Sequence, residues 1–442
     1  MRQTIFLTFL SAILLTVAAP ASAQRVAAQN EQSGGGQPTQ QTKVVPAIRT
    51  QVYDRLTEAQ TCLDEEDTDC ALDIVEGISK MRDLNAYEQA NVWNFRAYLN
   101  FEIDNVDGAI DAYEHILALP FEDLPDGMIN SSMLNLATLY IQEDQLDKGL
   151  ALYMQWMELP SVTPSGDDYY LLASIYYQQD KYKDAVPALN QAIALEQAKG
   201  NLGDENWYVL LYVCYYQLEQ TDDVIKTLTI LVNNYTKRDH ILALAGQLSA
   251  LDREFDTLSL YEAAYDAGML SRGADQVQLA NLLLNSRAPY LAVKVLDKGL
   301  KDGEIDSTQD NWRLLAQSYQ LAQEHEKAVD ALKQASTLAN DGEVDRMLAE
   351  SYAQIADWDN CAQSAQKAID RGGIDRPDLV SLRLGQCLVN QKKYDEARRA
   401  FQEAAKNDES ARDARRWITY VDDEVTRVRA NEEALRSLRR GG

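Results

Sequence analysis

Apolar and polar positions follow one another along this chain in a pattern that repeats about every 36 residues, from Val52 to Asp408. In each copy, apolar residues recur three or four positions apart, stop at a short polar turn and then resume. This spacing predicts two amphipathic helices joined by a turn. In the clearest copy the apolar or small positions are Leu384, Gly385, Leu388, Tyr394, Ala397, Phe401 and Ala404.

Two positions of the repeat, the eighth and the twentieth, hold small residues in many copies. These residues are Ala97, Ala109, Ala137, Gly149, Ala173, Ala185, Ala280, Ala292, Ala316 and Ala328. Small residues there let the paired helices approach closely, and the pattern resembles the tetratricopeptide repeat. A helical pair of this length cannot bury its own apolar faces and stacks on its neighbours. We therefore expect an all-α fold, an α-solenoid of about ten tetratricopeptide hairpins.

The consensus spacing gives ten repeat starts, although the first and sixth copies match it poorly. The starts are near Val52, Ala90, Asn130, Gly166, Asp204, Asp239, Gly273, Gln309, Gly342 and Asp378. We assign residues 47–409 to the solenoid. From Ala411 to Arg440 the pattern changes to one helical segment, so we assign residues 410–442 to a capping helix and basic tail.

The first 23 residues have the features of a secretory signal peptide. Arg2 precedes an apolar run from Ile5 to Ala19, and Ala21-Ser22-Ala23 fits a cleavage site. A membrane anchor is the alternative, but the run is shorter than the roughly 20 residues that a spanning helix needs. We expect cleavage after Ala23, a disordered leader over residues 24–46, and a mature protein outside the cytoplasm.

The chain is strongly acidic, with a formal charge of -27 that becomes -28 when a signal peptide containing Arg2 is removed. From Gly342 to the end there are 18 basic and 19 acidic side chains, so the excess negative charge lies before Gly342. Such a body repels nucleic acid and anionic headgroups and favours neutral or basic partners. The basic residues between Lys392 and Arg416 either form a docking site or only solvate helix faces.

Four of the five cysteines are candidates for disulfide bonds in an oxidising compartment. Cys62 and Cys70 flank the turn of the first repeat. Cys361 and Cys387 lie on predicted helices of the last two repeats that pack together. Cys214 is at an inward position and is expected to be a buried free thiol.

The sequence holds no recognisable catalytic motif. The three histidines, His115, His240 and His325, lie in separate repeats and at no metal-ligand spacing. Nucleophile elbows, zinc motifs and phosphate-binding glycine loops are missing. We therefore expect no enzyme activity, no catalytic residues, no cofactor and no metal site.

A tetratricopeptide resemblance implies a protein-binding groove on the first helix of each pair, lined by consensus positions two, five, nine, twelve and thirteen. The candidate groove residues are Tyr98, Phe101, Tyr170, Tyr177, Tyr208, Tyr212, Tyr216, Asn281, Asn285, Arg313 and Gln317. Tyrosine suits recognition because it combines a large contact area with a polar tip. The alternative is that some tyrosines pack between helices, if the register is displaced by one residue.

Several motifs in the last third of the chain are more specific than the repeat consensus. They include Ala288-Pro289-Tyr290 and Gly372-Gly373, with Arg376-Pro377 after them. Over about residues 270–425 the chain is similar to periplasmic tetratricopeptide proteins encoded beside TonB, ExbB and ExbD in Gram-negative bacteria. The resemblance implies a location in the periplasm and a role accessory to TonB-dependent outer-membrane transport.

This resemblance also implies the class of partner. The groove would hold an extended segment of TonB, ExbD or a TonB-dependent receptor, with no nucleic acid partner and no membrane insertion after signal cleavage. TonB linkers are rich in Pro and Lys, which suits an acidic scaffold lined by tyrosine. Two alternatives remain: a chaperone for assembly of envelope or outer-membrane proteins, and a scaffold for cell-wall or glycan-uptake machinery.

Overall fold

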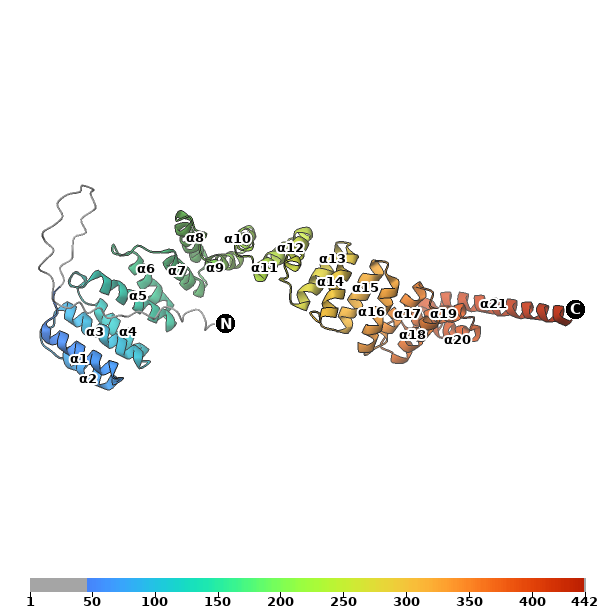
Figure 1. The fold of residues 1–442 in the computed structure, drawn as a ribbon, viewed down its shortest axis with the longest axis horizontal. Helices are drawn as coiled ribbons and strands as arrows, with labels where there is room; N and C mark the ends of the chain where they lie inside the picture. Colours follow the sequence, from blue (N-terminus) through green and yellow to red (C-terminus); the bar gives the residue numbers. More distant parts are fainter. Residues whose placement is uncertain (1–45, 441–442) are drawn as a thin grey trace. The chain divides into compact units, whose positions relative to one another are not determined.

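A computed structural model describes residues 46–440, and within this range the chain is all-α, with 21 α-helices, one short 3-10 helix and no strand. Consecutive helices pair into ten hairpins, and a single long helix follows the last pair (Figure 1). The predicted α-solenoid class is therefore confirmed. The predicted signal peptide, residues 1–23, and the predicted leader up to residue 45 lie outside the described residues.

The first helix of each pair, helix A, begins within four residues of a predicted repeat start. These helices are α1 (Thr50–Asp64), α3 (Ala86–Glu102), α5 (Asp126–Gln142), α7 (Gly166–Gln178), α9 (Glu205–Gln217), α11 (Arg238–Ser249), α13 (Gly273–Asn285), α15 (Gln309–Leu321), α17 (Glu343–Gln354) and α19 (Pro377–Asn390).

The second helix of each pair, helix B, begins four or five residues after its helix A ends. These helices are α2 (Thr68–Ser79), α4 (Val106–Leu117), α6 (Leu146–Met157), α8 (Tyr182–Ala198), α10 (Thr221–Asn234), α12 (Glu254–Asp266), α14 (Pro289–Asp302), α16 (His325–Leu338), α18 (Trp358–Arg371) and α20 (Tyr394–Ala404). The short 3-10 helix η1 (Phe121–Asp123) precedes α5, and the final helix is α21 (Asp408–Arg440).

The chain forms two compact units, whose boundary falls within α5 between Leu136 and Ala137. In the first unit, Val52, Ile78 and Leu99 belong to a buried core. In the second unit, one continuous buried core runs from Ile241 to Val421. The small residues of the eighth and twentieth positions are buried, as their role in close helix approach requires.

Each turn between helices A and B contains one residue in the left-handed conformation. These residues are Glu66, Asp104, Asp144, Asp180, Glu219, Asp252, Arg287, Gln323, Ala356 and Lys392. In the fourth repeat, the Asp180 N–H donates to the Tyr177 carbonyl and the Lys181 N–H to the Tyr176 carbonyl. This is the Schellman arrangement, which satisfies the last carbonyls of helix A. The same pair of hydrogen bonds recurs in all ten turns.

The left-handed residue gives an internal measure of the repeat register. In eight repeats it follows the predicted start by fourteen positions. In the fifth repeat Glu219 follows Asp204 by fifteen, and in the sixth Asp252 follows Asp239 by thirteen. The predicted register was therefore displaced by one residue in these two repeats, which start at Glu205 and at residue 238.

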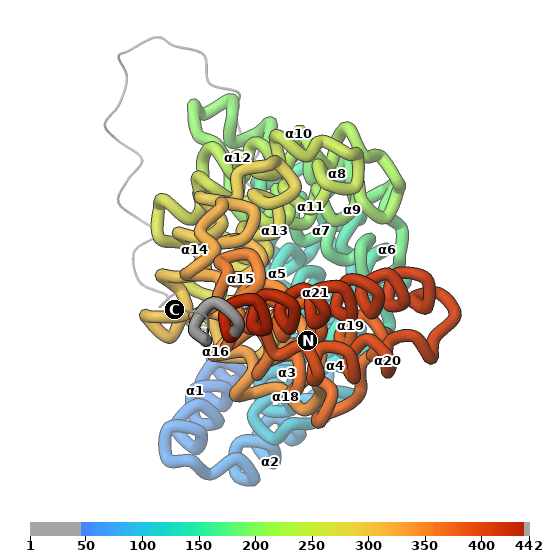
Figure 2. Tube along the Cα trace, turned by 90° about the vertical axis from the view of Figure 1, so that its right-hand side faces the viewer, coloured from blue at the N-terminus to red at the C-terminus, as the bar shows by residue number. Residues whose placement is uncertain are grey.

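The long helix α21 closes the second unit. It runs beside α19 and α20 (Figure 2). Trp417 stacks on Phe401 with the ring centroids 5.5 Å apart, and Val421 is buried. From Thr426 to residue 436 every side chain is exposed. The first half of the helix therefore covers the apolar end of the last repeat, as a capping helix does.

Among residues 46–440, no helix combines the length and the apolar character that crossing a bilayer requires.

Candidate protein-binding surface

In the first unit, two predicted groove residues lie on α3. Tyr98 is half-buried, and Phe101 is 43% exposed at the end of the helix. Burial, and then the neighbouring Glu102 carboxylate, raise the pKa of Tyr98. Phe101 therefore offers an apolar contact on this face of α3, while the Tyr98 hydroxyl remains protonated at neutral pH.

In the second unit, α7 and α9 contact each other and carry the remaining predicted tyrosines. Tyr177 and Tyr216 occupy the same position of successive repeats, three residues before the left-handed residue of the turn. The Tyr177 ring lies 5.6 Å from that of Tyr182, and Tyr216 is 58% exposed. Tyr170 is half-buried and stacks on Trp207 of α9 with centroids 6.4 Å apart. The helix A face of these two repeats is therefore aromatic.

Tyr208 is not a groove residue, which corrects its prediction. The corrected register moves it from the fifth to the fourth position, where it points into the core. Its side chain is only 2% exposed, and its hydroxyl donates a hydrogen bond of 2.6 Å to the Leu202 carbonyl. The ring also packs near Tyr235, with centroids 6.2 Å apart.

Tyr212 changes role for the same reason. The corrected register places it at the eighth position, where other repeats hold a small residue between the paired helices. It is half-buried, and burial followed by the charge of Asp239 raises its pKa. Tyr212 is therefore an interhelical packing residue, which was the alternative that the sequence left open.

The helix A face becomes amide-rich and charged toward the C-terminus. Asn281 is half-buried and Asn285 exposed on α13, while Gln317 is exposed on α15. The Arg313 guanidinium lies 3.5 Å from the Asp310 carboxylate. The register of these four residues is unchanged by the structure, and their place in a binding groove stays a prediction.

The groove prediction did not include four charged residues on the following helices. Arg346 pairs with Glu343 at 2.6 Å on α17, and Arg383 of α19 pairs with Glu350 of α17 at 2.6 Å. Arg346 and Glu350 occupy the fifth and ninth positions of the ninth repeat, so the consensus register was sufficient to find them. Arg383 occupies the sixth position and could be placed on this face only from the structure.

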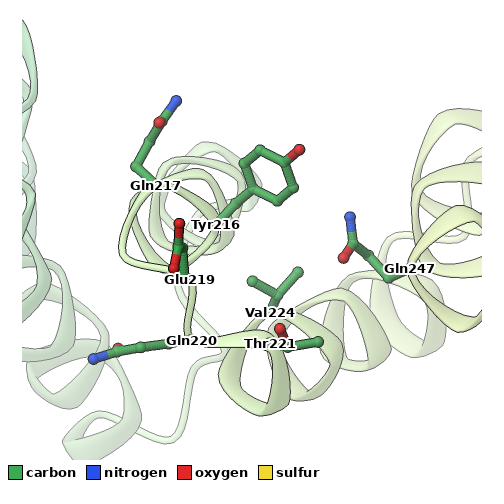
Figure 3. A pocket seen from close by; sticks show the side chains of 7 residues that line it. All are labelled: Tyr216, Gln217, Glu219, Gln220, Thr221, Val224 and Gln247. Atoms are coloured by element: carbon green, nitrogen blue, oxygen red, sulfur yellow. The ribbon is translucent and has the colours of Figure 1, made fainter. Parts of the chain in front are cut away.

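A hollow of about 330 Å³ opens beside Tyr216 where α9, α10 and α11 meet. We call it the Tyr216 hollow; its lining residues are Tyr216, Gln217, Glu219, Gln220, Thr221, Val224 and Gln247. Figure 3 shows the Tyr216 ring and the Gln247 amide on opposite sides of the open space, with Val224 and Thr221 below. Its volume lies at the lower end of the range for small ligand pockets, which is enough for one side chain of a partner.

Both pairs of predicted cysteines are bonded in the structure. Cys62 and Cys70 join α1 to α2 with their Cα atoms 5.8 Å apart, and Cys361 and Cys387 join α18 to α19 at 6.0 Å. These separations are normal for disulfides. Cys214 is a free, fully buried thiol, and burial raises its pKa to about 11. A thiol held protonated in this way is a packing residue and not a nucleophile.

Within the described part of the chain, no three His, Cys, Asp or Glu side chains converge in a way that could hold a metal ion. The phenols with large pKa shifts have structural causes. The Asp180 carboxylate raises the pKa of Tyr182 to about 12, and burial raises that of Tyr319 to about 12. The side chains described above on the helix A face therefore offer contact surface, hydrogen-bonding groups and charge.

Comparison with known families identifies two of the hairpins. Residues 169–199, within α7 and α8, and residues 380–411, which include α20, each match the tetratricopeptide repeat. These segments are tetratricopeptide repeats. No curated protein matches the chain.

Three solved structures illustrate the similarity. One is a tetratricopeptide repeat protein from Parabacteroides merdae, 14% identical, covering 60% of this chain and 99% of its own, with a TM-score of 0.33. Another is the C-terminal part of a repeat-containing protein from Cytophaga hutchinsonii, 13% identical, covering 64% and 95%, with a TM-score of 0.35. The third is the TPR2AB domain of yeast Sti1 in complex with pHSP90, 14% identical, covering 67% and 99%, with a TM-score of 0.29.

Proposed function

We propose that this protein is a scaffold that binds extended segments of partner proteins on the helix A face of its repeats. The observation that carries the proposal is the aromatic surface of α7 and α9, where Tyr216 is 58% exposed beside an open hollow. Stacked helical repeats use extended faces of this kind for binding. Exposed tyrosines supply contact area while losing little conformational freedom.

We assign no catalytic step to the protein. Perturbed titratable groups in a cleft would indicate catalysis. Here the strongly shifted groups belong to packing or to ion pairs between neighbouring residues, as for Tyr319 in the core and Asp378 beside Arg376. Binding to a partner accounts for the exposed residues without any reaction.

The proposed setting is the periplasm, in support of TonB-dependent outer-membrane transport. Three features of the sequence support it: a signal-like N-terminus, the motifs at Ala288-Pro289-Tyr290 and Gly372-Gly373, and the large negative charge. An acidic face with tyrosines is complementary to a basic, proline-containing segment such as a TonB linker. ExbD and a receptor segment are the other partners of this class.

Site-specific photocrosslinking in the source organism tests the proposal. A photoreactive residue replaces Tyr177 or Tyr216 on the helix A face. The matched control replaces Tyr290, which is 56% exposed but lies on helix B of the seventh repeat. We expect crosslinks to TonB, ExbD or a TonB-dependent receptor from the first two sites and not from Tyr290.

The same experiment separates the alternatives. Crosslinks from Tyr177 and Tyr216 to many unrelated outer-membrane proteins would identify an assembly chaperone. Crosslinks to cell-wall enzymes or glycan transporters would identify a scaffold for that machinery. If neither site captured any protein, the binding function itself would be refuted.

A further inference from the structure

On one side of the Tyr216 hollow, the sixth repeat departs from most other repeats. At the tenth repeat position most of them hold buried residues such as Ile175, Cys214 and Cys387, whereas the sixth holds the half-buried Gln247. The side of the hollow that α11 contributes is therefore polar.

The hollow combines an apolar floor with polar walls. Val224 is 1% exposed at its base, and the ring of Tyr216 forms one side (Figure 3). The Gln247 amide points toward the space beside the Tyr216 ring, whereas the Gln217 and Gln220 side chains extend away from it, and Glu219 contributes a carboxylate (Figure 3). No basic side chain is among the lining residues. The only formal charge in the hollow is therefore negative.

The surrounding repeats are short of positive charge. Residues 166–269 contain sixteen acidic and seven basic side chains. Six of those seven basic side chains already lie within ion-pairing distance of a carboxylate; they are Lys181, Lys199, Lys226, Lys237, Arg238 and Arg253. These cations pair with only five of the sixteen carboxylates of residues 166–269. Among the described side chains, Glu219 belongs to no ion pair, so its carboxylate is available to a cation of a partner.

We propose that the Tyr216 hollow receives the side chain of a lysine or arginine from an extended basic segment, an inference that rests on the proposed function and adds an anchor point to it. The alkyl part of that side chain packs on Val224 and on the Tyr216 ring, and its cation lies against the ring and the Glu219 carboxylate. The Gln247 amide accepts hydrogen bonds from backbone N–H groups of the segment and donates to its carbonyls.

Fluorescence anisotropy with two labelled probes tests this assignment on the full mature chain. One probe is an alternating Pro-Lys peptide of about twelve residues, which is extended before it binds. The other is the matching Pro-Gln peptide. At about 0.15 M salt, where surface charges are screened beyond about 8 Å, we expect the Pro-Lys peptide to bind and the Pro-Gln peptide to bind at least about tenfold more weakly.

Matched variants locate the binding. Tyr216→Ala and Glu219→Gln are each expected to weaken Pro-Lys binding about tenfold, because the first removes the ring and the second the charge. Tyr290→Ala and Glu254→Gln remove an equally exposed ring and an exposed carboxylate elsewhere, and should leave affinity within about twofold. Equal losses in all four variants would mean diffuse attraction to an acidic surface, and would overturn the assignment.

The outcome is distinguishable from failure of the proposed function. If Tyr177 and Tyr216 crosslink a partner in cells while Glu219→Gln leaves Pro-Lys binding unchanged, the scaffold function stands and the binding of a basic side chain in the Tyr216 hollow is refuted. If the Tyr216 hollow binds the Pro-Lys peptide but neither site crosslinks a protein, the binding of a basic side chain stands and the scaffold function is refuted.

Discussion

The residue in the left-handed turn of each repeat bears a conformational cost that depends on its side chain. None of the ten turns uses glycine, for which this conformation carries no penalty. Asp, in four of the turns, tolerates it because its short side chain hydrogen-bonds locally. Ala356, with φ of 60°, has neither advantage. The turn of the ninth repeat is therefore more strained, at Ala356, than the four turns that hold Asp.

Replacing Ala356 by glycine should stabilise the protein. The left-handed conformation costs a non-glycine residue about 1–2 kcal/mol, and glycine removes this cost. The greater conformational freedom of glycine in the unfolded chain offsets part of the stability gained. We expect Ala356→Gly to raise the free energy of unfolding by about 0.5–1 kcal/mol. Differential scanning calorimetry measures the accompanying rise in Tm.

Ala322 provides the control, because it sits one residue before the turn residue of the eighth repeat with φ of -80°. Its conformation is ordinary, so Ala322→Gly should give no gain or a small loss. If both glycine variants raised Tm equally, strain at Ala356 would not be the cause.

A second prediction at this scale concerns the buried carboxylate of Asp378. Arg376 donates hydrogen bonds of 3.0 and 2.7 Å to its two oxygens and holds its pKa at about 2. Because this pKa is below the usual value of about 3.9 in unfolded chains, the stabilisation is complete above about pH 4 and is lost as the pH falls toward 2. Asp378→Asn should therefore cost about 1–2 kcal/mol at pH 7 and flatten the loss of stability below pH 4.

Thermal midpoints measured at pH 7, 4 and 3 check this expectation. The control is Asp375→Asn, which removes one carboxylate three residues away from an exposed position with no ion pair to Arg376. It should leave the acid profile of the wild type intact. Identical profiles for the two variants would show that Asp378 does not provide this acid sensitivity.

The sequence predicted the small buried positions and eight of the ten registers, but it misplaced Tyr208 and Tyr212. One residue of displacement turns a helical side chain by about 100°, which moves a core position onto the surface. A glycine that recurred at the turn position of each repeat would have marked the register. Here the turn positions hold Asp, Glu, Arg, Gln, Ala and Lys, so the turn has no sequence signature. The register of the fifth and sixth repeats could be determined only from the backbone conformation of their turns.

At the scale of elements, close packing between helices requires glycine at some positions and only tolerates it at others. Gly385 of α19 faces the ring of Phe401, and a Cβ there would lie 2.6 Å from the ring carbon Cζ. Phe401 is fully buried and stacked on Trp417, so the ring has no room to move. Gly246 of α11, in contrast, has open space around it.

Alanine at these two glycines should therefore have opposite effects. Both substitutions gain about 1 kcal/mol of helix propensity. At Gly385 the clash with Phe401 costs about 1–3 kcal/mol and exceeds this gain, so Gly385→Ala should lower Tm. At Gly246 nothing opposes the gain, so Gly246→Ala should raise Tm. Equal signs for the two variants would contradict the packing of α19 on α20.

The Tyr216 hollow could not be predicted from the sequences of the helices that form it. The sequence predicted Tyr216 as a groove residue, but it did not predict the space beside that side chain. That space depends on how α9, α10 and α11 meet, and on an amide at a position that most other repeats bury. A consensus register assigns a direction to each side chain. It does not give the separation between neighbouring helices.

At the scale of the whole molecule, a stack of repeats is held together by contacts between neighbours only. In the second unit, each helix contacts mainly the helices adjacent to it in the chain. Stability in such a stack is the sum of local terms, so the ends open most easily. The bond between Cys361 and Cys387 joins the ninth repeat to the tenth, where α21 closes the stack.

Removing this bond should therefore loosen one end of the stack and leave the middle intact. Cys361→Ser with Cys387→Ser removes a link that closes a loop of 26 residues, and links of this length contribute about 3 kcal/mol. Hydrogen exchange should accelerate in α17 to α21 and remain unchanged in α7 to α10. Cys214→Ser, which also buries a hydroxyl but breaks no link, should accelerate exchange only around α9. We expect local effects because nearest-neighbour coupling confines each disturbance to the repeats that touch it. A uniform loss of protection across residues 137–440 after either change would contradict this, and would show that the second unit unfolds as one cooperative body.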